Sequence, residues 1–196
     1  MTRKELFDII GIKDMIHLPA AVMDIVTGGT ERRDSIYRAL MEANLFDLSR
    51  DWFQTLYEEE LAQRKNDKQD FTPAEVGIIL SGIINQQEGS IHEPTAGTGG
   101  LIIAEWHKRQ RAHLPWEFFP SQNMVYCWEL SDRAIPLLLL NLSIRGMMGY
   151  VYHGDVLTRE TKECYILLNP KDDALAFSDI IKCNNQNLKI VSHEIK

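Results

Sequence analysis

Residues 93–100 read Glu93-Pro94-Thr95-Ala96-Gly97-Thr98-Gly99-Gly100, and this short segment decides the fold. It follows a segment with strand character and precedes an apolar helical segment that begins at Leu101. Glycines in a strand–helix turn let backbone N–H groups approach a ligand closely, and the helix N-terminus adds a partial positive charge. A glycine run of this kind also occurs in ordinary turns, so its neighbours along the chain decide its meaning.

Three predicted strands end in an acidic residue: Glu93, Glu129 and Asp155. Helical segments alternate with these strands, which is typical of parallel βαβ units. The carboxyl ends of parallel strands meet at one edge of a sheet, so the three carboxylates are expected to face one crevice. There Glu129 can accept hydrogen bonds from ribose hydroxyls, and Asp155 can accept one from an adenine amino group. The predicted strands lie within residues 89–93, 124–129, 150–155 and 164–168.

The spacing of the glycines narrows the choice of ligand. It matches neither the Gly-x-Gly-x-x-Gly dinucleotide fingerprint nor the Gly-x-x-x-x-Gly-Lys-Ser/Thr phosphate loop, so a pyrophosphate is not the expected ligand. An acidic residue at the start of the loop, Glu93, suits a ligand with a cationic amino-acid portion. S-adenosylmethionine combines such a portion with an adenosine.

The first 70 residues have helical patterning, with apolar side chains at helical spacing and a breaker at residues 27–30. The polar stretch 64–70 is typical of a linker, and Thr72 with Pro73 then favours the start of a helix. We therefore predict an N-terminal helical segment over residues 1–70 and an α/β domain over residues 71–196. An aromatic stripe in the first segment is interpreted as helix packing rather than as a ligand platform. Its members are Trp52, Phe53, Leu56, Tyr57 and Leu61.

Composition and charge exclude several classes of protein. Lys and Arg number 21 against 28 Asp and Glu, which gives a net charge of −7 and excludes a classical basic nucleic-acid-binding domain, although a local basic groove stays open. The three cysteines are widely spaced and predict no disulfide framework, and the histidines lack metal-ligand spacing. Without an apolar signal core or a membrane-length apolar stretch, we expect a cytoplasmic protein with no membrane partner.

Residues 69–170 resemble the N6-adenine DNA methyltransferases, in particular the modification subunits of type I restriction systems. Four motifs in the family's order support the resemblance. Gln69-Asp70-Phe71-Thr72-Pro73 is similar to the segment that touches the methionine portion of the cofactor, and residues 93–100 are similar to the cofactor loop. Trp128-Glu129-Leu130 with its trailing helix is similar to the ribose-binding segment, and His153-Gly154-Asp155 is similar to the adenine-contacting turn.

The resemblance implies a Rossmann-like α/β fold that binds S-adenosylmethionine. Carried over residue by residue, it implies a set of cofactor contacts in this chain. They are Phe71, Thr72, Pro73, Glu93, Pro94, Thr95, Gly97, Thr98, Gly99, Gly100, Glu129 and Asp155.

The catalytic motif departs from the family pattern. The family places Asp, Asn or Ser before two prolines and an aromatic residue, so that polar acceptors hold the target amine and a ring stacks on the flipped base. Here the fourth predicted strand is followed by Asn169-Pro170-Lys171-Asp172, which keeps Asn169 and Pro170 as the expected catalytic pair but lacks the second proline and the aromatic ring. Phe177 is a candidate replacement for that ring.

Length also departs from the family. Only 27 residues follow Asn169, whereas parallel strands need crossovers of about a dozen residues or more each. We therefore expect a C-terminally truncated sheet without a target-recognition segment.

Three functions remain open on the sequence. The first is an S-adenosylmethionine-dependent DNA methyltransferase of the N6-adenine type that needs a partner specificity subunit to recognise DNA. The alternative is a catalytically inactive relative that binds S-adenosylmethionine and acts as a regulator or decoy of a modification system. A third is methylation of another substrate, such as RNA or protein.

Overall fold

The computed structural model describes residues 1–58, 74–83 and 88–183, and the statements below concern these residues. Phe71, Thr72 and Pro73 lie outside them, as does the predicted boundary at residue 70. The described helices are α1 (Arg3–Ile10), α2 (Leu18–Val26), α3 (Thr30–Ala43), α4 (Gln54–Leu56), α6 (Ala74–Ile83), α7 (Gly100–Arg111) and α8 (Ala134–Ser143), with 3-10 turns η1 (Met15–His17) and η3 (Pro120–Gln122). The strands are β1 (Ile91–Glu93), β2 (Val125–Glu129), β3 (Gly149–Asp155), β4 (Glu160–Leu168) and β5 (Asp179–Lys182).

The N-terminal helices begin and end where local side chains dictate. Thr2 and Glu5 form a reciprocal capping box at the start of α1, and Gly11 ends that helix in the left-handed conformation at φ 81°. Pro19 stands in the first turn of α2, where its missing N–H costs no helical hydrogen bond. The described part of the N-terminal segment thus contains α1, η1, α2, α3 and α4.

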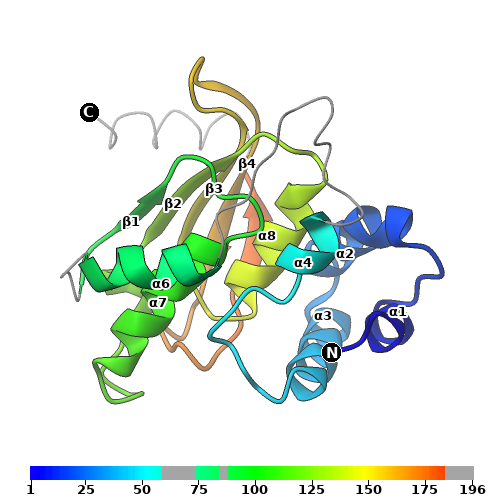
Figure 1. Cartoon of the computed structure of the whole chain (residues 1–196), viewed down its shortest axis with the longest axis horizontal. Coiled ribbons are helices and arrows are strands. Elements are labelled where there is room, and N and C mark those ends of the chain that lie inside the picture. Colours follow the sequence, from blue (N-terminus) through cyan, green and yellow to red (C-terminus); the bar gives the residue numbers. More distant parts are fainter. Residues whose placement is uncertain (59–73, 84–87, 184–196) are drawn as a thin grey trace.

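The sheet has the order β1-β2-β3-β4-β5, and its first three strands are parallel (Figure 1). Ile91 pairs with Val125 and Val125 pairs with Gly149, so the carboxyl ends of these strands reach one edge together, as predicted. Among the described residues, β1 stands at the end of this order and is an edge strand. The expected α/β, Rossmann-like class is confirmed in this parallel part.

The fourth strand differs from the parallel pattern that the sequence suggested. β4 begins at Glu160, four positions before the predicted start at Cys164, and runs antiparallel to β3. Only residues 156–159 connect the two strands, which is enough for a hairpin but not for a helical crossover. The hairpin rises above the rest of the sheet in Figure 1. β5 continues the antiparallel arrangement beside β4.

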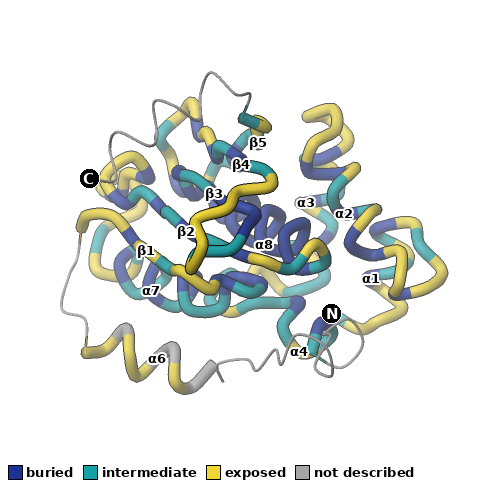
Figure 2. Tube along the Cα trace, turned by 90° about the horizontal axis from the view of Figure 1, so that it is seen from above, coloured by how far each residue is buried: buried dark blue, intermediate teal, exposed yellow. Residues whose placement is uncertain are grey.

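One hydrophobic core joins the N-terminal helices to the sheet. Buried side chains of α1 and α2, such as Leu6 and Val22, belong to the same cluster as Val125 and Val151 of the parallel strands. Helix α8 packs against α2 and is buried along its whole length, which Figure 2 shows as a dark centre of the molecule. Among the described residues, no helix combines the length and apolar character needed to cross a bilayer.

Candidate functional site

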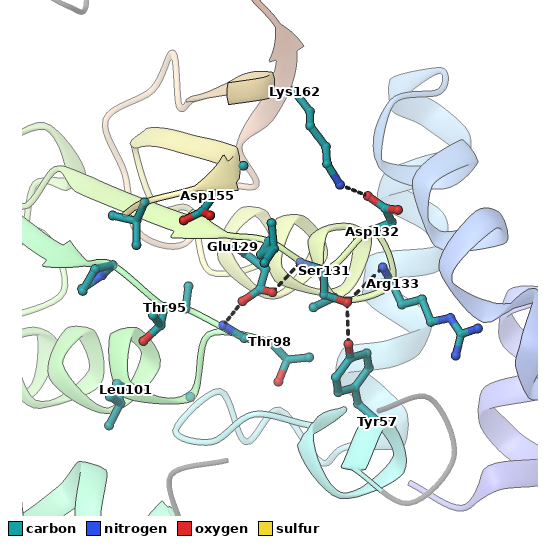
Figure 3. Close-up of a pocket in the computed structure, with 18 of the residues that line it drawn as sticks. Tyr57, Thr95, Thr98, Leu101, Glu129, Ser131, Asp132, Arg133, Asp155 and Lys162 are labelled. Atoms are coloured by element: carbon teal, nitrogen blue, oxygen red, sulfur yellow. Dashed lines mark hydrogen bonds and ion pairs between the residues drawn. The ribbon is translucent and has the colours of Figure 1, made fainter. Parts of the chain in front are cut away.

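A pocket of about 800 Å³ opens at the carboxyl ends of β1, β2 and β3 (Figure 3). This volume lies in the range of ordinary small-ligand sites. Most of the described residues that the sequence predicted for the cofactor line it: Pro94, Thr95, Gly97, Thr98, Gly100, Glu129 and Asp155. Glu93 and Gly99 do not line it but support the loop that does.

The glycine loop turns sharply between β1 and α7. Gly97 and Gly99 have φ values of 57° and 101°, a left-handed backbone that favours glycine. A Cβ atom on Gly99 would also lie 3.0 Å from Leu138 Cδ1, so the loop packs closely on α8. The N–H of Ala96 donates to the carbonyl of Trp128 at 2.8 Å, which fixes the loop to the end of β2.

Glu129 lies at the floor of the pocket and is 7% exposed. Its Oε2 accepts from the N–H of Gly97 at 2.7 Å, and its Oε1 accepts from the N–H of Ser131 at 2.7 Å. Burial raises the pKa of Glu129, while these backbone donors act in the opposite direction. A carboxylate has about four acceptor positions, so Glu129 can still accept hydrogen bonds from ligand hydroxyls.

The other two predicted acids hold their own turns. Asp155 Oδ1 accepts from the N–H of Leu157 at 2.8 Å, which shapes the turn after β3 while the residue borders the pocket. Glu93 Oε1 accepts from the N–H of Thr95 at 3.0 Å and so caps the start of the glycine loop. Asp155 therefore lies at the pocket wall, as the sequence predicted. Glu93 does not face the pocket as expected, but accepts a hydrogen bond that stabilises the start of the glycine loop.

Residues near α4 form a wall of the pocket that the sequence analysis missed. Gln54 and Tyr57 line it, and the Tyr57 hydroxyl lies 2.8 Å from Ser131 Oγ (Figure 3). Tyr57 is 1% exposed, so its interpretation as a packing residue is correct but incomplete. Helical periodicity predicts that a side chain is buried, but not that its polar end reaches a distant site.

Charged side chains form a rim at the outer side of the pocket. Lys162 on β4 pairs with Asp132 at 2.8 Å, and His153 Nε2 lies 2.8 Å from the same carboxylate oxygen. The hydrogen bond from Lys162 holds the pKa of Asp132 below its usual value. Lys162 reaches this place only because β4 returns along β3 as a hairpin, which the sequence analysis did not foresee.

Asn169 and Pro170 are not brought to the pocket. Because β4 is antiparallel to β3, its carboxyl end lies beside the amino end of β3, and Asn169 sits there at 2% exposure. Its Nδ2 donates to the carbonyls of Gly146 at 2.9 Å and Asp173 at 2.8 Å. We expected Asn169 and Pro170 as a catalytic pair beside the cofactor crevice, but the structure places Asn169 at the opposite end of the sheet. Its Oδ1 is buried and has no hydrogen-bond partner among the described residues.

Phe177, the candidate replacement ring, also lies away from the pocket. It packs edge-on against Tyr37, with ring centroids 5.2 Å apart, beside the shared core. The described pocket lining contains one aromatic residue, Tyr57, and its hydroxyl is hydrogen-bonded to Ser131. The described lining therefore does not provide the stacking ring of the family motif.

Comparison with known proteins relates this geometry to one family. The family model described as N-6 DNA Methylase matches residues 48–187. A type I restriction enzyme MjaIX methylase subunit from Methanocaldococcus jannaschii is 24% identical over 131 residues, which cover 64% of this chain but 23% of that protein. A modification subunit assigned to a type I restriction enzyme of Vibrio vulnificus YJ016 has 16% identity and a TM-score of 0.44, over 66% of this chain and 25% of that one.

Proposed function

Because the chain belongs to the N-6 DNA methylase family, we propose that its pocket binds S-adenosylmethionine and forms the cofactor half of a site that methylates N6 of adenine in DNA. The observation that supports this most is the Glu129 carboxylate, fixed at the pocket floor by an N–H of the glycine loop. The chain spans 23% of the length of the curated relative it matches. The activity and the partners given below are therefore proposals for this chain.

The residues present fit an adenosine with a charged amino-acid tail. Glu129 accepts hydrogen bonds from the two ribose hydroxyls, and Asp155 accepts one from the adenine amine. The left-handed glycines bring the backbone of residues 97–100 close to the ligand, and the start of α7 offers free N–H groups. Phe71, Thr72 and Pro73, which lie outside the described residues, are assigned to the methionine portion of the ligand by the family resemblance. The bound group would supply an electrophilic methyl carbon, and the protein would orient it and exclude water.

Asn169 and Pro170 take no part in this proposal, because the structure buries Asn169 at the opposite end of the sheet. The polar acceptor for the target amine and the DNA-reading surface are therefore assigned to a partner specificity or recognition subunit. The net charge of −7 also opposes association of the isolated chain with DNA phosphates.

The same placement of Asn169 favours a second candidate function. A chain that holds S-adenosylmethionine while its Asn169 lies at the far end of the sheet can act as a regulator or decoy of a modification system without transferring a methyl group. This candidate shares the cofactor pocket with the first and differs only in the reaction.

Transfer of a radiolabelled methyl group to unmodified DNA tests these proposals. We expect little or no methylation by the chain alone at physiological salt, and methylation when the specificity subunit of its own system is added. Calorimetry with S-adenosylmethionine and S-adenosylhomocysteine tests the pocket separately. Robust methylation by the chain alone, abolished in Asn169→Ala, would contradict the assignment of the acceptor to a partner, and absence of cofactor binding would contradict both candidate functions.

A further inference from the structure

A carboxylate outside the pocket holds one of the pocket's own side chains. Asp51 lies just before α4, and its side chain points inward to Thr98, which is 3% exposed and lines the pocket. The Thr98 hydroxyl donates to Asp51 Oδ2. Asp51 Oδ1 accepts from Asn141 Nδ2 at 2.8 Å and from the N–H of Phe53 at 2.8 Å.

The donors around Asp51 are themselves fixed. Asn141 is fully buried on α8, and its Nδ2 also donates to the carbonyl of Thr98 at 2.8 Å. Asn141 therefore contacts both the glycine loop and the segment that contains Asp51. Removing one member of such a buried network leaves its partners unsatisfied, so the network favours a single arrangement of the loop.

Arg145 also holds residues 48–52, the segment that contains Asp51, by hydrogen bonds to backbone carbonyls. Its guanidinium donates to the carbonyl of Leu48 at 2.9 Å and to that of Arg50 at 2.7 Å, and it stacks over the Trp52 ring at 5.1 Å. It also donates to the carbonyl of Asn141 at 2.7 Å. Residues 48–53 are thus held against α8 by a fully enclosed cation, and the pocket wall formed by Gln54 and Tyr57 follows directly.

We propose that Asp51 is a positioning residue for the cofactor pocket: through the Thr98 hydroxyl it couples occupation of the pocket to the ordering of residues 48–57. The inference rests on the proposed cofactor binding. A loop with two left-handed glycines loses much conformational freedom when it is fixed. If the network fixes the loop and the wall together, a ligand that orders one of them orders both.

A double-mutant cycle on ligand affinity tests whether Asp51 acts through Thr98. S-adenosylhomocysteine is titrated calorimetrically into wild type, Asp51→Asn, Thr98→Val and the double variant. We expect each single change to weaken binding about tenfold, and the double variant to bind no more than about twofold worse than either single one, because both changes break the same contact. Thr98→Ser keeps the hydroxyl and should restore affinity to within about threefold of wild type.

Asp47→Asn is the matched control. Asp47 lies four positions earlier, and within the described part of the chain its carboxylate makes its hydrogen bonds and ion pair inside its own loop, with the N–H of Ser49 at 3.1 Å and with Arg50 at 2.8 Å. We expect it to change affinity less than about twofold and to combine additively with Thr98→Val. Additive effects of Asp51→Asn and Thr98→Val, or an unchanged affinity in Asp51→Asn, would overturn the inference.

Hydrogen exchange adds a readout that a purely structural role would not move. Binding of S-adenosylhomocysteine should slow exchange of the amides of residues 48–57 in wild type, but not in Thr98→Val at a saturating ligand concentration. Equal protection in both would overturn the coupling. If wild type binds neither S-adenosylmethionine nor S-adenosylhomocysteine, the proposed function fails. The positioning role of Asp51 is then tested by hydrogen exchange of the ligand-free protein. The role stands if the amides of residues 97–101 exchange faster in Asp51→Asn than in Asp47→Asn, and fails if they do not.

Discussion

The two ends of the sheet use similar polar residues in opposite ways. At the carboxyl ends of β1–β3, Glu129 is held by two backbone donors and still faces a pocket. At the other end, Asn169 directs its amide hydrogens to carbonyls of Gly146 and Asp173, and Ser178 donates to the carbonyl of Met147 at 2.6 Å. A polar side chain that faces a pocket with open acceptor positions is available to a ligand. One whose donors are taken up by surrounding carbonyls holds the fold together.

The largest expected effect is the loss of Glu129. Glu129→Ala removes the acceptor at the pocket floor and leaves the N–H groups of Gly97 and Ser131 without their partner, so affinity for S-adenosylmethionine should fall at least about 100-fold, or about 2.7 kcal/mol. Calorimetry measures it. Asp132→Asn, a carboxylate on the exposed rim, is the matched control and should change affinity less than about threefold. Similar losses in both variants would remove the distinction between floor and rim.

The opposite end should respond in stability instead. Asn169→Ala leaves two carbonyls without their donor, which should lower the free energy of unfolding by about 2 kcal/mol, and Asn169→Asp should lower it further by placing a carboxylate against those carbonyls. Chemical denaturation of the variants measures this, together with S-adenosylmethionine affinity, which should stay within about threefold of wild type. A stable Asn169→Ala variant with no cofactor binding would reverse the comparison between the two ends.

Titration of Asp51 should give a smaller, pH-dependent effect. Burial raises the pKa of Asp51 above its ordinary value of 3.8, although the neighbouring Arg145 charge opposes this. Between the pKa of Asp51 in the unfolded chain and its higher pKa in the folded chain, the folded chain binds more protons than the unfolded chain. This group's contribution to stability therefore falls as pH rises. Asp51→Asn removes that titration. The Tm of wild type minus the Tm of the variant should therefore shrink as the pH rises above about 4, and a difference that grows would contradict the sign.

The smallest effect concerns the ion pair between Lys162 and Asp132. Both side chains are more than half exposed, and pairs of this kind contribute about 0.2–1 kcal/mol. Lys162→Ala should lower the Tm by no more than a few degrees, and the difference should diminish at high salt. Thermal unfolding at low and high ionic strength measures it. A large, salt-independent loss would show that the β3–β4 hairpin depends on this pair.

The parallel strands and the glycine loop were predictable because each has a local signature. Glu129 and Asp155 end apolar strands, and residues 93–100 combine glycines with a helix start. The hairpin was not predicted because β4 begins with the charged run Glu160–Glu163, which has no apolar alternation and projects toward solvent. That one error in direction moved Asn169 from the pocket edge to the opposite end of the sheet.

The contribution of Asp51 and Tyr57 could not be predicted for a different reason. Their partners Thr98 and Ser131 stand 47 and 74 positions away in the sequence. Local patterning reports burial and secondary structure, whereas a contact between such distant residues depends on how complete elements pack. The same limit explains why the sequence did not reveal that helices of the first 58 residues share one core with the sheet.

The mixed direction of the sheet also sets an order of assembly. Tyr150 pairs with Ile166 and Leu167 with Ile180, 16 and 13 positions apart, whereas Ile91 pairs with Val125 across 34 positions. Closing a short loop loses less chain entropy than closing a long one, and topologies with local contacts fold faster. The β3–β5 meander should therefore form in the folding transition state, with β1 and its glycine loop added late. Val151→Ala would then slow folding, while Ile91→Ala would chiefly speed unfolding.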